Sequence, residues 1–330
     1  MTRRSLSRAA GWGAGLAVLA AVPLVLPIYH QFVLSLTLVN AIAAMGVNLS
    51  MGYAGQVSIG HAGFVAIGAY TAAILMTKMA APYWVTLPLG GAAAALSGFL
   101  IGLPALRLSH LYIGMVTFGF GQAIGFIALN WVALTNGPNG LAVPPITLGS
   151  FTFSPDTFYY VIAAAFLLLL WVAKNLVGSR VGRSFLAIRE SETAAEAMGV
   201  NLVRYKTMAF AVGAAYAGLA GGLYAGLSQF VNPDAFVFLV SVLYLTMNVV
   251  GGMGTLAGPL LGAVIFTLMP EMLRTFAEYK ELLSGALLLR FLVFFPRGLV
   301  GILGPALSRR WPWSGKPAPL PAASSVVDEA

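Results

Sequence analysis

The side chains best suited to chemistry in the first half of the chain lie in one glycine-rich stretch, residues 48–70. Asn48, Gln56 and His61 stand there among five glycines, whereas the neighbouring stretches are chiefly Ala, Leu, Val and Ile. Amide and imidazole groups can hydrogen-bond a solute, but a proton-coupled mechanism usually adds a carboxylate. No Asp or Glu precedes Asp156. We therefore do not expect proton transfer here, and we expect His61 to be mainly a hydrogen-bonded structural group.

A second glycine-rich stretch, at residues 251–264, repeats the pattern with the string "GGMGTLAGPLLGAV". Such stretches are typical of helices that pack closely through small residues, or of a membrane helix that is interrupted to line a polar passage. Both interpretations remain open. The glycines assigned to packing or interruption are Gly52, Gly55, Gly60, Gly63, Gly251, Gly252, Gly254 and Gly258. The candidates for lining a passage are Asn48, Gln56, His61, Gln122 and Asn130.

The stretch from Lys174 to Lys206 is the only sizeable part of the chain with mixed charges, six basic and three acidic. Thr193 and Glu196 have the spacing of a capping box, so we expect a short helix to begin at Thr193. Gly199 is suited to the left-handed position that ends a helix. Because so short a helix is marginal alone in water, we expect it to dock against something. The alternative is a surface helix that merely joins two membrane spans.

Motifs for common enzyme chemistry are missing from the sequence. It has no phosphate-binding G-x-x-x-x-G-K-[ST], no H-E-x-x-H, no G-x-S-x-G and no cysteine. We therefore expect neither catalytic residues nor a metal site, and we expect the chain to bind no cofactor of its own.

The elements that must position these residues are membrane helices. Of 330 residues, 59% are hydrophobic and only 8% are charged, and the mean hydropathy is +0.88. An all-α, polytopic membrane bundle follows, because a spanning helix needs about 20 mainly apolar residues. The basic residues stand in short runs between apolar stretches, which is typical of membrane topology signals and not of nucleic-acid binding. We expect ten spans, with glycine-rich interruptions, near 11–29, 32–51, 60–77, 84–105, 111–133, 157–173, 207–228, 235–251, 255–273 and 282–300.

Basic residues also predict the orientation, since they concentrate in cytoplasmic loops. Fourteen of the 18 fall on the side that holds both termini, three fall on the other side, and Arg290 lies within the last span. Both termini are therefore expected in the cytoplasm. The expected organisation is a basic cytoplasmic N-terminus (1–10), a transmembrane domain (11–303) with an external loop at about 134–156 and a cytoplasmic loop at about 174–206, and a disordered cytoplasmic tail (304–330). Arg3 and Arg4 also resemble an export signal, but nine further apolar segments favour an uncleaved first span.

Several long strings together resemble the permease subunit of bacterial branched-chain amino acid ABC transporters, specifically the LivM family. The similarity runs from about residue 36 to 303. Its strings are "GYAGQVSIGHAGFVAIGAYTAA" (52–73), "LYIGMVTFGFGQ" (111–122), "TNGPNGL" (135–141), "GRSFLAIRESETAAEAMGVNLVRYKTMAF" (182–210), "GGMGTLAGPLLGAV" (251–264) and "FFPRGLVGIL" (294–303). Two positions depart from the family pattern: Gln122, where Glu is common, and Arg290, where an apolar residue is common.

The resemblance implies that residues 182–206 are the cytoplasmic coupling segment. It places Arg189, Glu190, Glu192, Thr193, Glu196 and Gly199 at or beside the contact with an ATPase. It also implies a multi-pass subunit in the bacterial plasma membrane that pairs with a homologous permease. Two cytoplasmic ATPases would use the ATP, and an external binding protein would deliver branched-chain amino acids. A related importer of urea or short amides is the nearest alternative. A stand-alone secondary transporter is disfavoured by the missing membrane carboxylates.

Overall fold

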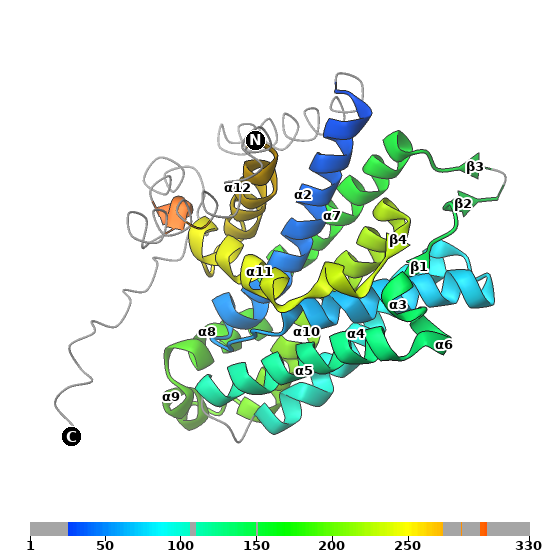
Figure 1. Ribbon diagram of the computed structural model, residues 1–330. Helices are drawn as coiled ribbons and strands as arrows, with labels where there is room; N and C mark the ends of the chain where they lie inside the picture. Colours follow the sequence, from blue (N-terminus) through cyan, green and yellow to red (C-terminus); the bar gives the residue numbers. More distant parts are fainter. Residues whose placement is uncertain (1–25, 106–109, 150, 273–284, 286–297, 302–330) are drawn as a thin grey trace.

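The computed structural model describes residues 26–105, 110–149, 151–272, 285 and 298–301 (Figure 1). Within these residues, seven helices are long and apolar enough to cross a membrane. The main helices are α2 (Ile28–Val47), α3 (His61–Met79), α4 (Tyr83–Ala105), α5 (His110–Asn130), α7 (Pro155–Gly178), α10 (Leu202–Ser228), α11 (Phe238–Gly251) and the shorter α12 (Gly258–Met272). The all-helical bundle is confirmed. Most or all of the expected spans 11–29 and 282–300 lies outside the described residues, as do residues 1–10, Arg290 and the tail 304–330.

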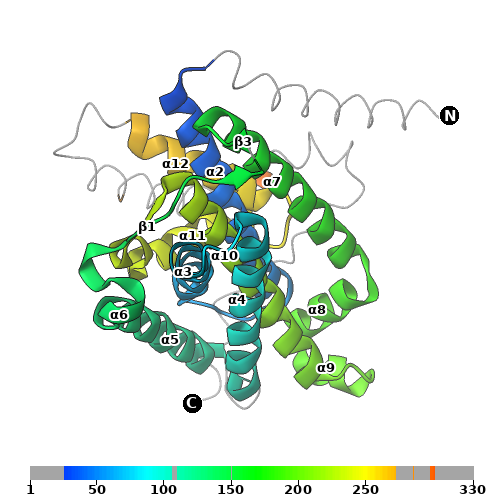
Figure 2. The same cartoon turned by 90° about the vertical axis from the view of Figure 1, so that its right-hand side faces the viewer.

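The bundle has an inner group of helices and an outer group. Helix α2 with its continuation to Tyr53 is 78% buried along its most apolar window, and α3 and α10 are mostly buried as well. Helix α5 is only 22% buried and lies at the rim, with α3 and α10 inside (Figure 2). A helix in this outer position must face lipid or another protein, because no water is available in the hydrocarbon layer.

Helix α10 packs against α3 and α4 through a stripe of small residues. A methyl group added at Gly218 would lie 2.4 Å from Cβ of Ala94, and one added at Gly221 would lie 2.0 Å from the carbonyl oxygen of Val65. Backbones can approach this closely only where side chains are absent, which is how membrane helices gain contact without a hydrophobic driving force between them. The sequence analysis did not single out this stripe, although it is visible in "GAAYAGLAGG" at residues 213–222.

The connections between helices gather at two opposite ends (Figure 1). At one end, β1 (Leu141–Ala142) pairs antiparallel with β4 (Phe230–Val231), and the hairpin of β2 (Thr147–Leu148) and β3 (Phe151–Thr152) extends nearby. The short helices α6 (Val132–Thr135) and η2 (Gly137–Asn139) belong to the same end. At the other end lie α8 (Arg180–Glu190) and α9 (Glu192–Ala197). The grouping places the loop 134–156 opposite the loop 174–206, as the basic residues predict, without showing which end faces the cytoplasm.

Candidate functional site

The glycine-rich stretch 48–70 contains a buried interruption between α2 and α3. After Val47 the helix widens into a π segment, η1 (Asn48–Tyr53), and residues 54–60 are non-helical before α3 begins at His61. This non-helical part runs along α5: the amide of Ile59 donates to Oγ1 of Thr117 at 3.1 Å. Thr117 lies seven residues, or about 10 Å along the helix axis, after the first residue of α5. Helix α3 therefore begins beside the interior of α5 and not beside its end. Wide helical turns of this kind are frequent at functional positions.

Asn48 joins this interruption to the second glycine-rich stretch. Its Nδ2 donates to the carbonyl oxygen of Thr255 at 2.7 Å, and its Oδ1 accepts from the amide of Gly254 at 2.8 Å. Both partners lie in the turn between α11 and α12. Position 52 must be glycine, because a methyl group there would lie 2.1 Å from Oδ1 of Asn48. One buried amide therefore satisfies two backbone groups of a turn more than 200 residues away in the chain.

An arginine from the mixed-charge loop completes this cluster. Nη1 of Arg189, near the end of α8, donates to the carbonyl oxygen of Gly52. The stem of Arg189 lies over Gly55, where an added methyl group would lie 3.3 Å from its Cγ. We call the five residues Asn48, Gly52, Gly55, Arg189 and Gly254 the glycine junction. It brings the end of α2, the α11–α12 turn and the mixed-charge loop to one point.

His61 of α3 and Asn248 of α11 each donate a hydrogen bond to the backbone of α2. Nε2 of His61 donates to the carbonyl oxygen of Ala43 at 3.2 Å, and Nδ2 of Asn248 donates to that of Ala44 at 2.8 Å. The His61 ring is buried and makes an edge contact with Tyr244. In this state both side chains hold helices together and neither is open to a passage.

Gln56 differs from Asn48 and His61, although it is buried just as deeply. Neither of its side-chain amide atoms has a hydrogen-bond partner in the described part of the chain, and the same is true of Oγ of Ser58. An unsatisfied buried polar atom costs about 1–3 kcal/mol. The non-helical part of the interruption is therefore its energetically weakest part in this conformation.

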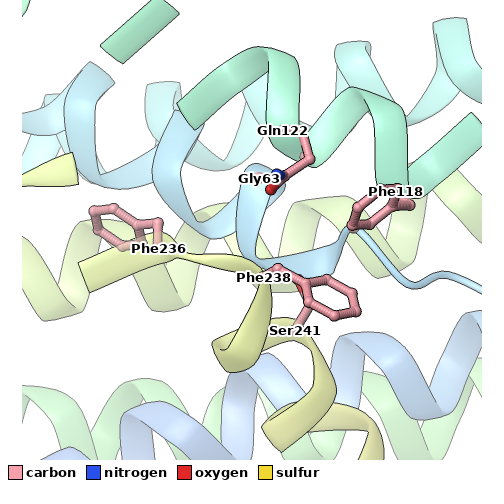
Figure 3. A pocket seen from close by; sticks show the side chains of 8 residues that line it. Gly63, Phe118, Gln122, Phe236, Phe238 and Ser241 are labelled. Carbon is pink, nitrogen blue, oxygen red and sulfur yellow. The ribbon is translucent and has the colours of Figure 1, made fainter. Parts of the chain in front are cut away.

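A small cavity lies where α3 begins. Gly60, which precedes α3, and Gly63 of α3 face Phe118, Gly121 and Gln122 of α5 across it, and Phe236, Phe238 and Ser241 complete its wall. Figure 3 shows the Gln122 side chain directed from α5 toward Gly63. The amide of Ala62 donates to Oγ of Ser241 at 2.9 Å, which satisfies one free donor of the first turn of α3. At about 10 Å³ the cavity has roughly the space of one water molecule, far less than an amino acid needs.

The structure does not gather the five passage candidates into one site. Asn48 and His61 are buried in helix contacts and Gln56 is buried without a partner. Gln122 and Asn130 are exposed side chains of α5. Nδ2 of Asn130 donates to the carbonyl oxygen of Phe126 in its own helix, at the end of the bundle away from Asn48. Of the five, only Gln122 borders the cavity.

The short helix α9 does not begin where the sequence analysis expects. Its N-cap is Ser191, whose hydroxyl accepts from the amide of Ala194 at 3.2 Å, so the expected start at Thr193 is wrong by two residues. Ser191 takes an extended conformation where α8 ends, and this makes it the first residue able to cap the next helix. Glu196 is therefore not part of a capping box. At the other end Gly199 has φ +82°. The backbone amide of Gly199 donates to the carbonyl oxygen of Glu196, and the backbone amide of Val200 donates to the carbonyl oxygen of Ala195. These two bonds form a Schellman motif.

Helix α9 docks on α10 through a charge pair. Nζ of Lys206 lies 2.5 Å from Oε1 of Glu192, and the Lys206 side chain is almost fully buried. Glu192 is the first residue of α9, where its charge also suits the helix dipole. Glu190, Thr193, Glu196 and Met198 remain exposed on the surface of the unit. Helix α8 was not predicted, although Val181, Phe185 and Ile188 are spaced as one helix face and Ser179 precedes them as a cap.

Membrane-length helices, a buried interruption and a charged helical unit at one end define a multi-pass membrane transport protein. Comparison with known proteins specifies its family: the model for "Branched-chain amino acid transport system / permease component" matches residues 29–292. The chain belongs to this family. As a permease component it is a transport protein and not an enzyme.

Individual relatives agree with this assignment. The chain is 34% identical over 298 residues to the high-affinity branched-chain amino acid transport system permease protein LivM of Salmonella typhimurium, covering 83% of this chain and 70% of that protein. It is 35% identical to LivM of Escherichia coli K12 with the same coverage. The permease protein LivH of Escherichia coli K12 is 28% identical over 283 residues, covering 79% of this chain and 91% of that protein. No solved structure matches the chain.

Proposed function

We propose that this chain is one of two homologous permease subunits of an ATP-driven importer of branched-chain amino acids. Two cytoplasmic ATPases would drive the pair between inward-open and outward-open states, and an external binding protein would deliver the substrate. ATP would be used only by the partner subunits. The proposal places the protein in the bacterial plasma membrane, with ten spans and both termini in the cytoplasm. Similarity to both LivM and LivH of Escherichia coli K12 supports the pairing, because both are named as permease proteins of a high-affinity branched-chain amino acid transport system.

The observation that carries the proposal is the α8–α9 unit. Helix α9 is capped at both ends and fixed to α10 by the Glu192–Lys206 pair, so it is a rigid projection despite its length. The exposed surface of the α8–α9 unit includes Glu190, Glu196 and Met198, and 85% of the area of Met198 is exposed. A rigid, charged projection that connects to the glycine junction is well suited to receive motion from a partner protein.

Charge reversal on this surface tests the proposal. The double variant Glu190→Lys and Glu196→Lys is expected to reduce co-purification of the ATPase subunits and ATP-dependent uptake of leucine at least about tenfold, because like charges facing a partner cost several kcal/mol. Asp234→Lys, an acid-to-base change at the opposite end of the bundle, should leave ATPase co-purification unchanged. Normal assembly and uptake in the double variant would contradict the coupling role. Robust uptake by this chain alone, without ATP, would favour a secondary transporter.

The proposed orientation is tested by labelling single cysteines in this cysteine-free chain. A membrane-impermeant maleimide should label Thr152→Cys in intact cells, because that hairpin residue is exposed at the proposed external end. Ala197→Cys in α9 should be labelled only after the membrane is opened. Both positions are exposed in the structure, so protection in intact cells would reflect the membrane. The reverse pattern would refute the orientation.

A further inference from the structure

The glycine junction contains one long charged side chain, Arg189, and its placement differs from that of its neighbours in α8 and α9. Glu190, Thr193 and Glu196 are exposed at the surface of the unit, and Arg189 is exposed as well, but its guanidinium also reaches inward to the carbonyl oxygen of Gly52. These two residues are 137 positions apart in the sequence. The sequence analysis places Arg189 at the ATPase contact; in the structure its charged group contacts the end of the π segment.

Glycine stands at two points where other backbone comes close to Arg189, one beside its guanidinium and one beside its stem. A methyl group at Gly254 would lie 2.6 Å from Nη1 of Arg189, and one at Gly55 would lie 3.3 Å from Cα of the arginine. Gly55 and Gly254 both have φ of +71°, a left-handed conformation that side chains disfavour. Two separate glycine-rich stretches thus leave room for one arginine between them.

Asn48 closes the connection on the other side. It binds the amide of Gly254 and the carbonyl of Thr255, while Arg189 binds the carbonyl of Gly52, one helical turn after Asn48. A displacement of α8 is therefore applied to the π segment directly and to the α11–α12 turn through Asn48. Beyond the π segment lies the non-helical stretch, in which the side chains of Gln56 and Ser58 have no hydrogen bond to lose when it moves.

We propose that Arg189 is a positioning residue of the transport cycle: it transmits movement of the α8–α9 unit to the glycine junction and does not bind the ATPase. A planar guanidinium suits this task because it presents several donors in a fixed geometry, where a lysine presents a single point charge. The inference rests on the proposed function, since it needs an ATPase to move α8 and α9.

The test uses the complete transporter, with the second permease, both ATPases and the binding protein, in proteoliposomes. Amino acid transported per ATP hydrolysed is measured for Arg189→Gln and for a matched control, Arg183→Gln. Arg183 is also in α8, but its Nη1 donates only to the nearby carbonyl of Gly178, at 3.3 Å. Arg189→Gln is expected to keep ATPase co-purification and hydrolysis while the transport per ATP falls about tenfold. Arg183→Gln should keep the normal ratio, and Arg189→Lys should restore part of it.

Two outcomes would overturn the inference. A normal transport-to-ATP ratio in Arg189→Gln would show that the link carries no motion. Loss of ATPase co-purification, as expected for Glu190→Lys with Glu196→Lys, would make Arg189 a partner contact and would still support the proposed function. Should Arg189→Gln fail to assemble, Arg189→Met keeps the stem over Gly55, removes the donor and carries the same test. Failure of the proposed function itself would appear in the unmodified chain, as absence of ATPase binding.

Discussion

Replacing Gly60 with alanine is expected to lower the melting temperature of the purified protein sharply and to abolish uptake. The new methyl group would lie 1.7 Å from the carbonyl oxygen of Thr117, and every near atom belongs to backbone that cannot rotate away. Gly60 has φ −99°, so alanine adds no backbone strain and the whole effect is the separation of α3 from α5. Overpacking of this kind costs about 1–3 kcal/mol and occasionally more, and we expect the upper part of that range. Thermal unfolding in detergent measures it.

Gly119→Ala in α5 is the matched control. A methyl group there meets no atom within 4 Å, and alanine favours helix over glycine by about 0.5–1 kcal/mol. The control should therefore keep or slightly raise the melting temperature of the isolated subunit. Equal melting temperatures for the two variants would contradict the close contact between α3 and α5.

Asn48→Leu is expected to destabilise the protein by about 2–6 kcal/mol, because the amide of Gly254 and the carbonyl of Thr255 both lose their partner at about 1–3 kcal/mol each. Leucine has the same number of side-chain heavy atoms with the same branching, so an empty cavity does not explain the loss. Transport should fall as well, since the α11–α12 turn is no longer held to α2.

Asn130→Leu makes the same chemical change on the exposed face of α5, where the amide binds only its own helix. Its effect on thermal unfolding should be below about 0.5 kcal/mol, as for most surface substitutions. If both asparagine variants melt alike, the role assigned to Asn48 is wrong.

The spans could be predicted from the sequence because a membrane helix is defined by local composition alone. Eight of the ten expected segments correspond to the helices α2, α3, α4, α5, α7, α10, α11 and α12. The capping of α9 was harder, since Ser191 and Thr193 are equally good caps and the choice depends on where α8 ends. Helix α8 was missed because charged residues outnumber its three apolar anchors, so its signal is amphipathic and not hydrophobic.

The partners within the glycine junction could not be predicted from the sequence. Its glycines and Asn48 stand out by their types, but Asn48 meets a turn more than 200 residues away, and Arg189 meets Gly52 across 137. Hydrogen bonds over such separations depend on how the helices pack. The unpartnered state of Gln56 is likewise invisible in a single sequence, because it is a property of this arrangement of helices.

The pairing of β1 with β4 has a mechanical consequence. The backbone amide of Val143 also donates to the carbonyl oxygen of Gln229 at 2.8 Å, so residues 141–143 are hydrogen-bonded to the chain that follows α10. Val231 is followed closely by the short helix η3 (Pro233–Phe236), whose last residue, Phe236, lies in the cavity wall together with Phe238. Only a few residues of chain therefore separate the segment that β1 binds from the cavity wall. The position of that wall and the position of the loop between β1 and α7 depend on each other, at the end of the molecule away from α9.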